Sequence, residues 1–140
     1  MSEEKTVAER PVPRPNTYVN TQPFWDGAKE GKFMLQYCTD TDQFQFHPRP
    51  VSIFTGSRNL EWREVSGKGT IYATTVIRVP GPGIKDRIPL MAATVELDEG
   101  VRVIANILDA EPDDMKIGDK VELVWDTLDD GVPYPAFKLV

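Results

Sequence analysis

The strongest constraint on the fold of this 140-residue chain is a regular alternation of residue types in its C-terminal half. From residue 91 to residue 98, Met, Ala, Val and Leu alternate with Ala, Thr, Glu and Asp. Successive side chains of a β-strand point to opposite faces, so a period of two predicts a strand with one buried face. Residues 101 to 108 repeat the pattern after the tight turn Asp98-Glu99-Gly100. This region is therefore predicted to be a β-hairpin.

Further strands are expected on both sides of this hairpin. Residues 70 to 79 are rich in β-branched side chains, which suit a pleated surface. Apolar residues alternate again between 121 and 125, and residues 136 to 140 complete a fifth strand. Residues 111 to 116 begin with proline and acids, which suit a single helical turn. The C-terminal half is thus predicted to be mainly β, with five strands and one short helical connection.

Composition narrows the range of functions. The net charge of -6 disfavours nucleic acid as the ligand, because such binding depends mainly on Lys and Arg neutralising phosphates. No apolar run approaches the roughly 20 residues that span a bilayer. The chain starts without the apolar stretch of a secretory signal, and its single cysteine cannot form an internal disulfide. A cytoplasmic location is the expectation.

The N-terminal region predicts an arm followed by a short helix. Residues 1 to 22 are expected to be a flexible arm, because prolines at alternate positions between 11 and 15 favour extended backbone. Phe24 and Trp25 then begin an apolar pattern of helical spacing, and Gly31 suits the end of a helix. We expect this helix to pack through its two aromatic residues.

Cys38 occupies the place that the first ligand would take in a zinc ribbon. Such a ribbon uses two C-x-x-C knuckles, because tetrahedral zinc needs four ligands converging from two tight turns. The other three ligand positions of that frame fall on Thr41, Ser52 and Thr55. Neutral hydroxyls are poor zinc ligands beside thiolates. The sequence therefore predicts the ribbon without its metal.

A ribbon without zinc must be stabilised in another way, since structural zinc contributes about 10 kcal/mol to the folding of such modules. Residues 33 to 37, 44 to 47 and 60 to 65 have the composition of short strands. Apolar residues between and within them are expected to form a substitute core covered by Trp62; they are Phe44, Phe46, Ile53 and Phe54.

Few residues of this chain can carry catalysis. His47 is the only histidine, so any Ser-His-Asp or Cys-His device must use it. Two alternatives are open: a Cys38–His47 pair, and a mixed metal site formed by Cys38, Asp40, Asp42 and His47. A buried thiol and a loop histidine without a catalytic role are the favoured interpretation.

Short motifs between residues 23 and 139 resemble a known family when taken in order. The family pairs a rubredoxin-like zinc ribbon with an OB-fold, is catalogued as domain of unknown function 35, and is associated with acyl-CoA. The chain departs from its pattern at three of four zinc ligands. The resemblance implies a helix and degenerate ribbon at 23–66 and a five-stranded OB-fold barrel at 67–140. The motifs are Pro23-Phe24-Trp25-Asp26-Gly27, Glu30-Gly31-Lys32, Gln36-Tyr37-Cys38, Phe46-His47-Pro48-Arg49-Pro50, the run from Trp62 to Thr70, the run from Val95 to Arg102, and Ile117-Gly118-Asp119-Lys120-Val121.

The resemblance also implies a function. Related proteins sit beside thiolases, thiolase-like acyltransferases or aldolases and help to form the acyl-CoA site of the complex. The chain is then a non-catalytic accessory subunit without a cofactor of its own, and its partner supplies the catalytic residues. Whether the chain also forms a homodimer is left open.

OB barrels usually bind ligands through the loops that join strands one and two and strands four and five. In the first of these loops, Arg78, Lys85 and Arg87 are the residues expected to face the phosphates of CoA. The second loop, residues 126 to 134, carries acids that would repel a nucleic acid. A nucleic-acid-binding OB module is the alternative function, and a self-sufficient enzyme that uses Cys38 or His47 on acyl thioesters is a third.

Overall fold

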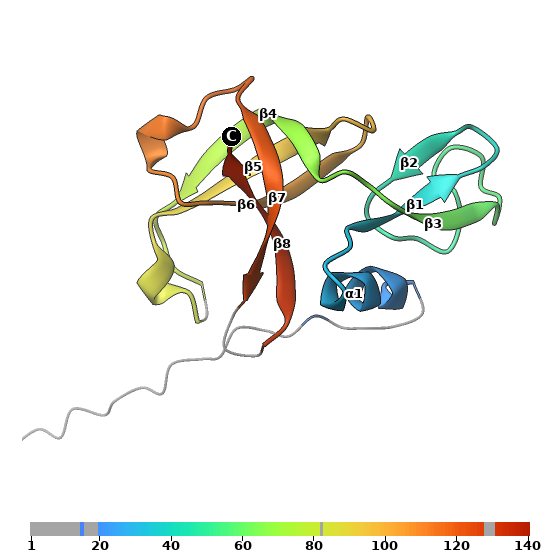
Figure 1. Ribbon diagram of the computed structural model, residues 1–140, viewed down its shortest axis with the longest axis horizontal. Helices are drawn as coiled ribbons and strands as arrows, with labels where there is room; N and C mark the ends of the chain where they lie inside the picture. The colour runs from blue at the N-terminus through green and yellow to red at the C-terminus, as the bar shows by residue number, and fades with distance from the viewer. Residues whose placement is uncertain (1–14, 16–19, 82, 128–130) are drawn as a thin grey trace, which may run out of the picture.

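The computed structural model describes residue 15 and residues 20–81, 83–127 and 131–140. Figure 1 shows a small sheet and a larger barrel, with a helix below the strand that enters the small sheet. The predicted N-terminal arm, residues 1 to 22, lies mostly outside the described residues. The observed architecture is the mainly β fold expected from the sequence.

The helix α1 spans Gln22–Lys29 and begins one residue before the predicted start. Pro23 stands in its first turn, where a missing N–H removes no helical hydrogen bond. Phe24 is buried on the inner face of the helix. Gly31 follows the helix with φ of 73°, a conformation that glycine adopts without strain.

Three antiparallel strands form the ribbon in the order β2-β1-β3. They are β1 (Met34–Cys38), β2 (Gln43–Gln45) and β3 (Leu60–Glu64). The register places Gln36 beside Gln45 on one side and beside Trp62 on the other. All three strands lie within two residues of their predicted bounds, and a long loop connects β2 to β3.

The five remaining strands close into a barrel in the order β4-β5-β6-β8-β7. The first three form a meander, and the barrel is closed by parallel pairing of β6 with β8 and antiparallel pairing of β4 with β7. This is the strand order of an OB-fold, and the sequence prediction is confirmed. The elements are β4 (Lys68–Ile77), the 3-10 helix η1 (Lys85–Arg87), β5 (Leu90–Leu97), β6 (Arg102–Leu108), the 3-10 helix η2 (Pro112–Asp114), β7 (Lys120–Thr127) and β8 (Pro133–Leu139).

Ribbon, helix and barrel share one hydrophobic core. Phe33 lies at the centre, with its ring centroid 6.1 Å from that of Phe24, 6.3 Å from that of Trp125 and 6.4 Å from that of Phe137. These edge-on arrangements are the ones that aromatic rings prefer. The ribbon is therefore packed against the barrel through the same apolar interior that stabilises the barrel.

The linker between ribbon and barrel is held at two points. The backbone N–H of Ser66 donates a hydrogen bond of 2.7 Å to Oε1 of Glu99, in the turn between β5 and β6. Gly67 has φ of 74°, and a Cβ there would lie 2.6 Å from Cβ of Leu123, so only glycine fits. Within the described ranges, the structure contains no helix that is long and apolar enough to cross a membrane.

Candidate functional site

The structure gathers three of the four former zinc-ligand positions. Cys38 is fully buried, and Ser52 Oγ donates a hydrogen bond of 3.1 Å to its Sγ. Hydrogen bonds from the hydroxyls of Ser52 and then Thr41 lower the pKa of the Cys38 thiol, because they favour the charged form. Thr55 instead donates its hydroxyl to Asp40 at 3.0 Å. The Thr55 hydroxyl is therefore paired with Asp40 and not with the Cys38 thiol.

These residues do not fit zinc. They offer one thiol and three hydroxyls, whereas structural zinc sites use thiolates and imidazoles. Among the residues that the structure describes, no three His, Cys, Asp or Glu side chains are grouped so that they could hold a metal ion. The alternative metal site built from Cys38, Asp40, Asp42 and His47 is thus not assembled. The described contacts do not join His47 to Cys38 either: His47 is exposed, and its ring lies 4.1 Å from that of Phe46.

Two buried glutamine side chains form the interior of the ribbon. The amide of Gln45 donates to Oε1 of Gln36 at 2.8 Å, and the amide of Gln36 donates to the carbonyl of Arg49 at 2.8 Å. The backbone N–H of Arg49 returns a 2.8 Å bond to Gln36 Oε1, and that of Ile53 donates to Gln45 Oε1 at 2.9 Å. Each amide is thus paired on both its donor and its acceptor side.

The prediction that Phe44, Phe46, Ile53 and Phe54 form an apolar core in place of zinc is wrong for two of these four residues. Ile53 is 57% exposed and Phe54 is 42% exposed. Phe44 and Phe46 are partly buried and pack against the common core, as does Trp62. The reason is that the two glutamines already fill the interior and fix the loop backbone with these side chains outside. The sequence could have predicted a buried Gln36, because Gln36 is two residues from Cys38 and its side chain therefore lies on the same face of the strand.

Asp40 holds the end of the loop between β2 and β3 through hydrogen bonds. Its carboxylate accepts hydrogen bonds from the hydroxyls of Ser57 and Thr55 and from the amide of Asn59, the last at 2.8 Å. These hydrogen bonds lower the pKa of Asp40, that from Ser57 most, because they stabilise the charged form. An acid and hydroxyls, in place of a metal, organise this turn.

The basic loop of the barrel is described except for Pro82. Arg78 and Lys85 are exposed there. Arg87 is 28% exposed and forms an ion pair of 2.5 Å with Asp126, itself 14% exposed, at the end of β7. The structure thus joins the first ligand loop of the barrel to the start of the second through Arg87. The acids Asp129 and Asp130 of the second loop lie outside the described residues.

The outer face of β4, β5 and β6 contains a shallow hollow of about 230 Å³. Its lining is small and uncharged: Ala73, Thr74, Thr75, Ala92, Ala93, Thr94 and Ile104. Close to it, the guanidinium carbon of Arg102 lies 3.7 Å from the centre of the Tyr72 ring. Nε of Arg102 lies 3.8 Å from Oε1 of Glu96. A groove for single-stranded nucleic acid needs free aromatic platforms among basic residues. The residues that line this hollow provide neither.

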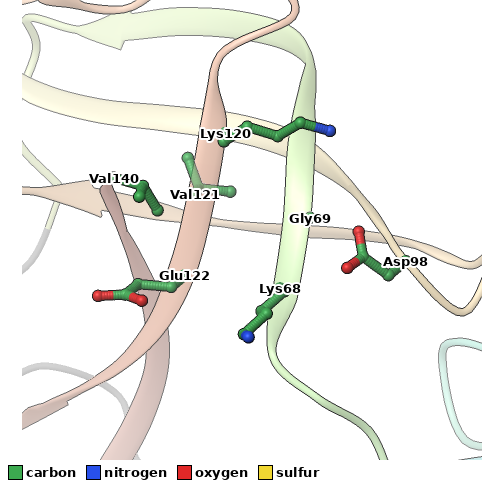
Figure 2. Close-up of a pocket in the computed structure, with 7 residues that line it drawn as sticks. All are labelled: Lys68, Gly69, Asp98, Lys120, Val121, Glu122 and Val140. Atoms are coloured by element: carbon green, nitrogen blue, oxygen red, sulfur yellow. The ribbon is translucent and has the colours of Figure 1, made fainter.

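A second hollow, of about 310 Å³, lies over the seam between β4 and β7 (Figure 2). Figure 2 shows Lys120 above and Lys68 below, with Val121 and Val140 beside them. Lys120 donates to Thr70 at 3.0 Å. The lining also includes Asp98 and Glu122, so both signs of charge are present and no anion is favoured.

Comparison with known proteins identifies both modules. Residues 25–51 match the family described as the rubredoxin-like zinc ribbon domain of ChsH2, and residues 62–126 match its C-terminal OB-fold domain. A solved structure described as an Ltp2-ChsH2(DUF35) aldolase is similar, with a TM-score of 0.81 and 28% identity over 90% of this chain and 98% of that one. A DUF35 protein of unknown function from Sulfolobus solfataricus shares the fold at a TM-score of 0.56 and 16% identity, over 85% of this chain and 82% of that one.

Curated relatives agree with this assignment. A probable enoyl-CoA hydratase alpha subunit of Thermomonospora curvata is 31% identical over 98% of this chain, which spans 42% of that protein. A DUF35 domain-containing scaffold protein of Methanothermobacter thermautotrophicus is 43% identical over 56% of this chain and 62% of its own length. The chain thus spans less than two thirds of either. A scaffold protein of the same description from Pyrococcus furiosus is 34% identical over 72% of this chain and 74% of its own length. The chain therefore belongs to the DUF35 family, in which a rubredoxin-like zinc ribbon precedes an OB-fold.

Proposed function

We propose that this chain is a non-catalytic accessory subunit that docks on a thiolase-like enzyme, an acyltransferase or an aldolase and helps to position acyl-CoA. The observation that carries the proposal is the similarity of nearly the whole chain, at a TM-score of 0.81, to a structure described as an Ltp2-ChsH2(DUF35) aldolase. The relatives described as scaffold proteins support the same role.

The chemistry of the described residues agrees with a supporting role. A nucleophile needs a base within hydrogen-bond reach, and that base needs a group that orients it. Cys38 is buried and accepts its hydrogen bond from Ser52, which is no base. His47 is exposed and stacks on Phe46. The reacting groups are accordingly assigned to the partner.

The acyl-CoA contact is assigned to the basic loop of the barrel. Arg78 and Lys85 are exposed cations on either side of its glycine- and proline-rich part, and phosphates are bound well by such groups. Arg87 forms an ion pair with Asp126 and, in this proposal, orders the loop. The side of its guanidinium that faces away from Asp126 then completes the contact with the phosphates. The loop then supplies charge to a ligand whose acyl group lies in the partner.

The test is a binding and activity experiment with a thiolase-like, acyltransferase or aldolase enzyme from the same organism. The two purified proteins should form a complex in size-exclusion chromatography, and the enzyme should turn over acyl-CoA faster with the chain than without it. Separate elution together with unchanged turnover would refute the subunit role. Turnover of acyl-CoA by the isolated chain, lost on Cys38→Ala or His47→Ala, would show an enzyme instead.

The ligand assignment has its own measurement. Calorimetric titration of the complex with CoA should show about tenfold weaker binding for Lys85→Ala or Arg78→Ala, because each change removes a charged hydrogen bond. Lys116→Ala, which removes an exposed cation elsewhere on the barrel, is the matched control and should bind as the unchanged protein does. Equal affinity in all three variants would remove the basic loop from the site.

A further inference from the structure

Residues 46 to 58, here called the knuckle loop, expose large apolar side chains in close succession. Val51 is 36% exposed, Ile53 57% and Phe54 42%. The other large apolar residues that are exposed in the described chain belong to the barrel and are well separated in sequence: Tyr72, Val79, Ile104, Ile117 and Val140. Single exposed residues are ordinary, whereas a group of them marks an interaction surface.

Hydrogen bonds hold this loop in one conformation. The buried amides of Gln36 and Gln45 bind its backbone at Arg49 and Ile53. Ser52 Oγ accepts from the N–H groups of Phe54, at 3.1 Å, and Thr55, at 3.3 Å. Because the backbone is already ordered, little conformational entropy is lost when the apolar side chains are buried by a partner.

The charge of the loop differs in sign from that of the whole chain. Residues 46 to 58 contain Arg49, Arg58 and the histidine but neither Asp nor Glu, in a chain of net charge -6. Both arginines are exposed. The Asp40 carboxylate also lies against the loop, but it accepts hydrogen bonds from Thr55, Ser57 and Asn59. With Arg49 and Arg58 at its edge, the apolar surface is complementary to an apolar cleft bordered by carboxylates.

We propose that the knuckle loop is a docking surface that inserts Ile53 and Phe54 into an apolar cleft rimmed by acids on the partner enzyme. This inference rests on the proposed function and specifies which part of the chain meets the partner. Of the two hollows described above, one is uncharged and the other carries lysines beside its acids, so neither offers an apolar cleft rimmed by acids to the loop of a second copy. The occupant is not a membrane, because the net negative charge of the chain opposes approach to anionic lipid.

The first test compares apolar substitutions in the knuckle loop with one at an exposed apolar residue of the barrel. The double variant Ile53→Ser/Phe54→Ser should bind the partner enzyme identified in the complex experiment above about tenfold to a hundredfold more weakly in surface plasmon resonance. Ile117→Ser, which removes a 73% exposed side chain from the barrel, should bind normally. Thermal melts of all variants report whether folding is intact.

The second test addresses the charged rim. Arg49→Glu/Arg58→Glu should slow association about tenfold at low salt, and the difference should shrink as salt is added, because a rim charge acts mainly on the association rate. Lys29→Glu/Lys116→Glu changes the net charge equally at other exposed sites and should have less effect.

The outcomes separate the two claims. If the unchanged chain fails to bind the enzyme, the proposed function is refuted and the docking inference falls with it. If the unchanged chain binds and the knuckle-loop variants bind equally well, the docking inference alone is wrong. Binding of the unchanged chain, and not of Ile53→Ser/Phe54→Ser, to phosphatidylcholine–phosphatidylserine vesicles would reassign the loop to a lipid surface. A dimer in sedimentation velocity that these variants dissociate would reassign it to self-association.

Discussion

The side-chain amide of Gln45 donates a 2.8 Å hydrogen bond to Oε1 of Gln36 across the β1–β2 pair, in the interior of the ribbon. A buried amide that loses its partner keeps the cost of its desolvation, so removing one of the two leaves the other unsatisfied. Gln45→Ala should therefore lower the free energy of unfolding by about 1–3 kcal/mol in urea denaturation. Gln43→Ala, on the same strand but exposed, is the control and should change it little. Equal effects would mean that the amide network contributes nothing specific.

The hydrogen bonds to Asp40 predict that the free energy of unfolding depends on pH. The pKa of Asp40 is lower in the folded protein than in the unfolded chain, so its contribution is present above the unfolded value of about 3.9. That contribution is lost as pH falls through the folded pKa. Asp40→Asn should be less stable than the unchanged protein at pH 7, and the difference should narrow as pH falls below about 4, the unfolded value, and through the lower folded pKa.

Urea denaturation at several pH values measures this difference. Asp113→Asn is the control, because Asp113 is an exposed acid without a side-chain hydrogen bond in the described structure. A gap between Asp40→Asn and the unchanged protein that stays constant with pH would assign the effect to lost packing rather than to charge.

The ion pair between Arg87 and Asp126 predicts coupling between the two ligand loops of the barrel. Both side chains are largely shielded from water, so the pair should contribute more than an exposed one, about 1–2 kcal/mol of coupling. A double-mutant cycle with Arg87→Ala and Asp126→Ala, followed by denaturation, measures it. Glu61→Ala with Arg63→Ala provides an exposed pair for comparison and should show less coupling. Restoration of stability by Arg87→Asp/Asp126→Arg would confirm an electrostatic origin.

Zinc provides the fourth prediction. The purified protein should contain less than stoichiometric metal by elemental analysis, and chelator should leave its melting temperature unchanged, because the ribbon offers only one thiol. The variant Thr41→Cys/Ser52→Cys/Thr55→Cys should acquire zinc and then melt at a lower temperature after chelation. Stoichiometric zinc in the unchanged protein would contradict the hydrogen-bonded ribbon described above.

The barrel was predictable because its strands leave a local record in the sequence. Val95 and Leu97 are buried while Glu96 between them is exposed, and a period of two is visible without any tertiary information. The short helix was predictable from the helical spacing of its apolar residues and from Gly31 at its end. In the structure Phe24 is buried and Gly31 has a positive φ, as this pattern requires. Local patterns thus predicted most element bounds to within two residues, whereas β8 begins at Pro133, three residues before its predicted start.

The interior of the ribbon and the pairing of the basic loop were harder to predict. Ile53 and Phe54 are apolar, so hydrophobicity alone assigns them to a core, yet the pairing of Gln36 with Gln45 places them outside. Arg87 finds Asp126 across 39 positions of sequence, and no local pattern records such a contact. Both depend on which strands become neighbours, which is a property of the folded chain.

The shared position of Phe33 between the ribbon, the helix and the barrel has a consequence for chimaeras. A zinc-binding ribbon taken from a related protein would replace Phe33 with that protein's residue at the contact with Trp125 and Phe137. Exchange of the metal-binding turns alone leaves that junction untouched, whereas exchange of the complete module breaks it. Chimaeras that exchange only the turns should therefore stay folded more readily than chimaeras that exchange the complete ribbon.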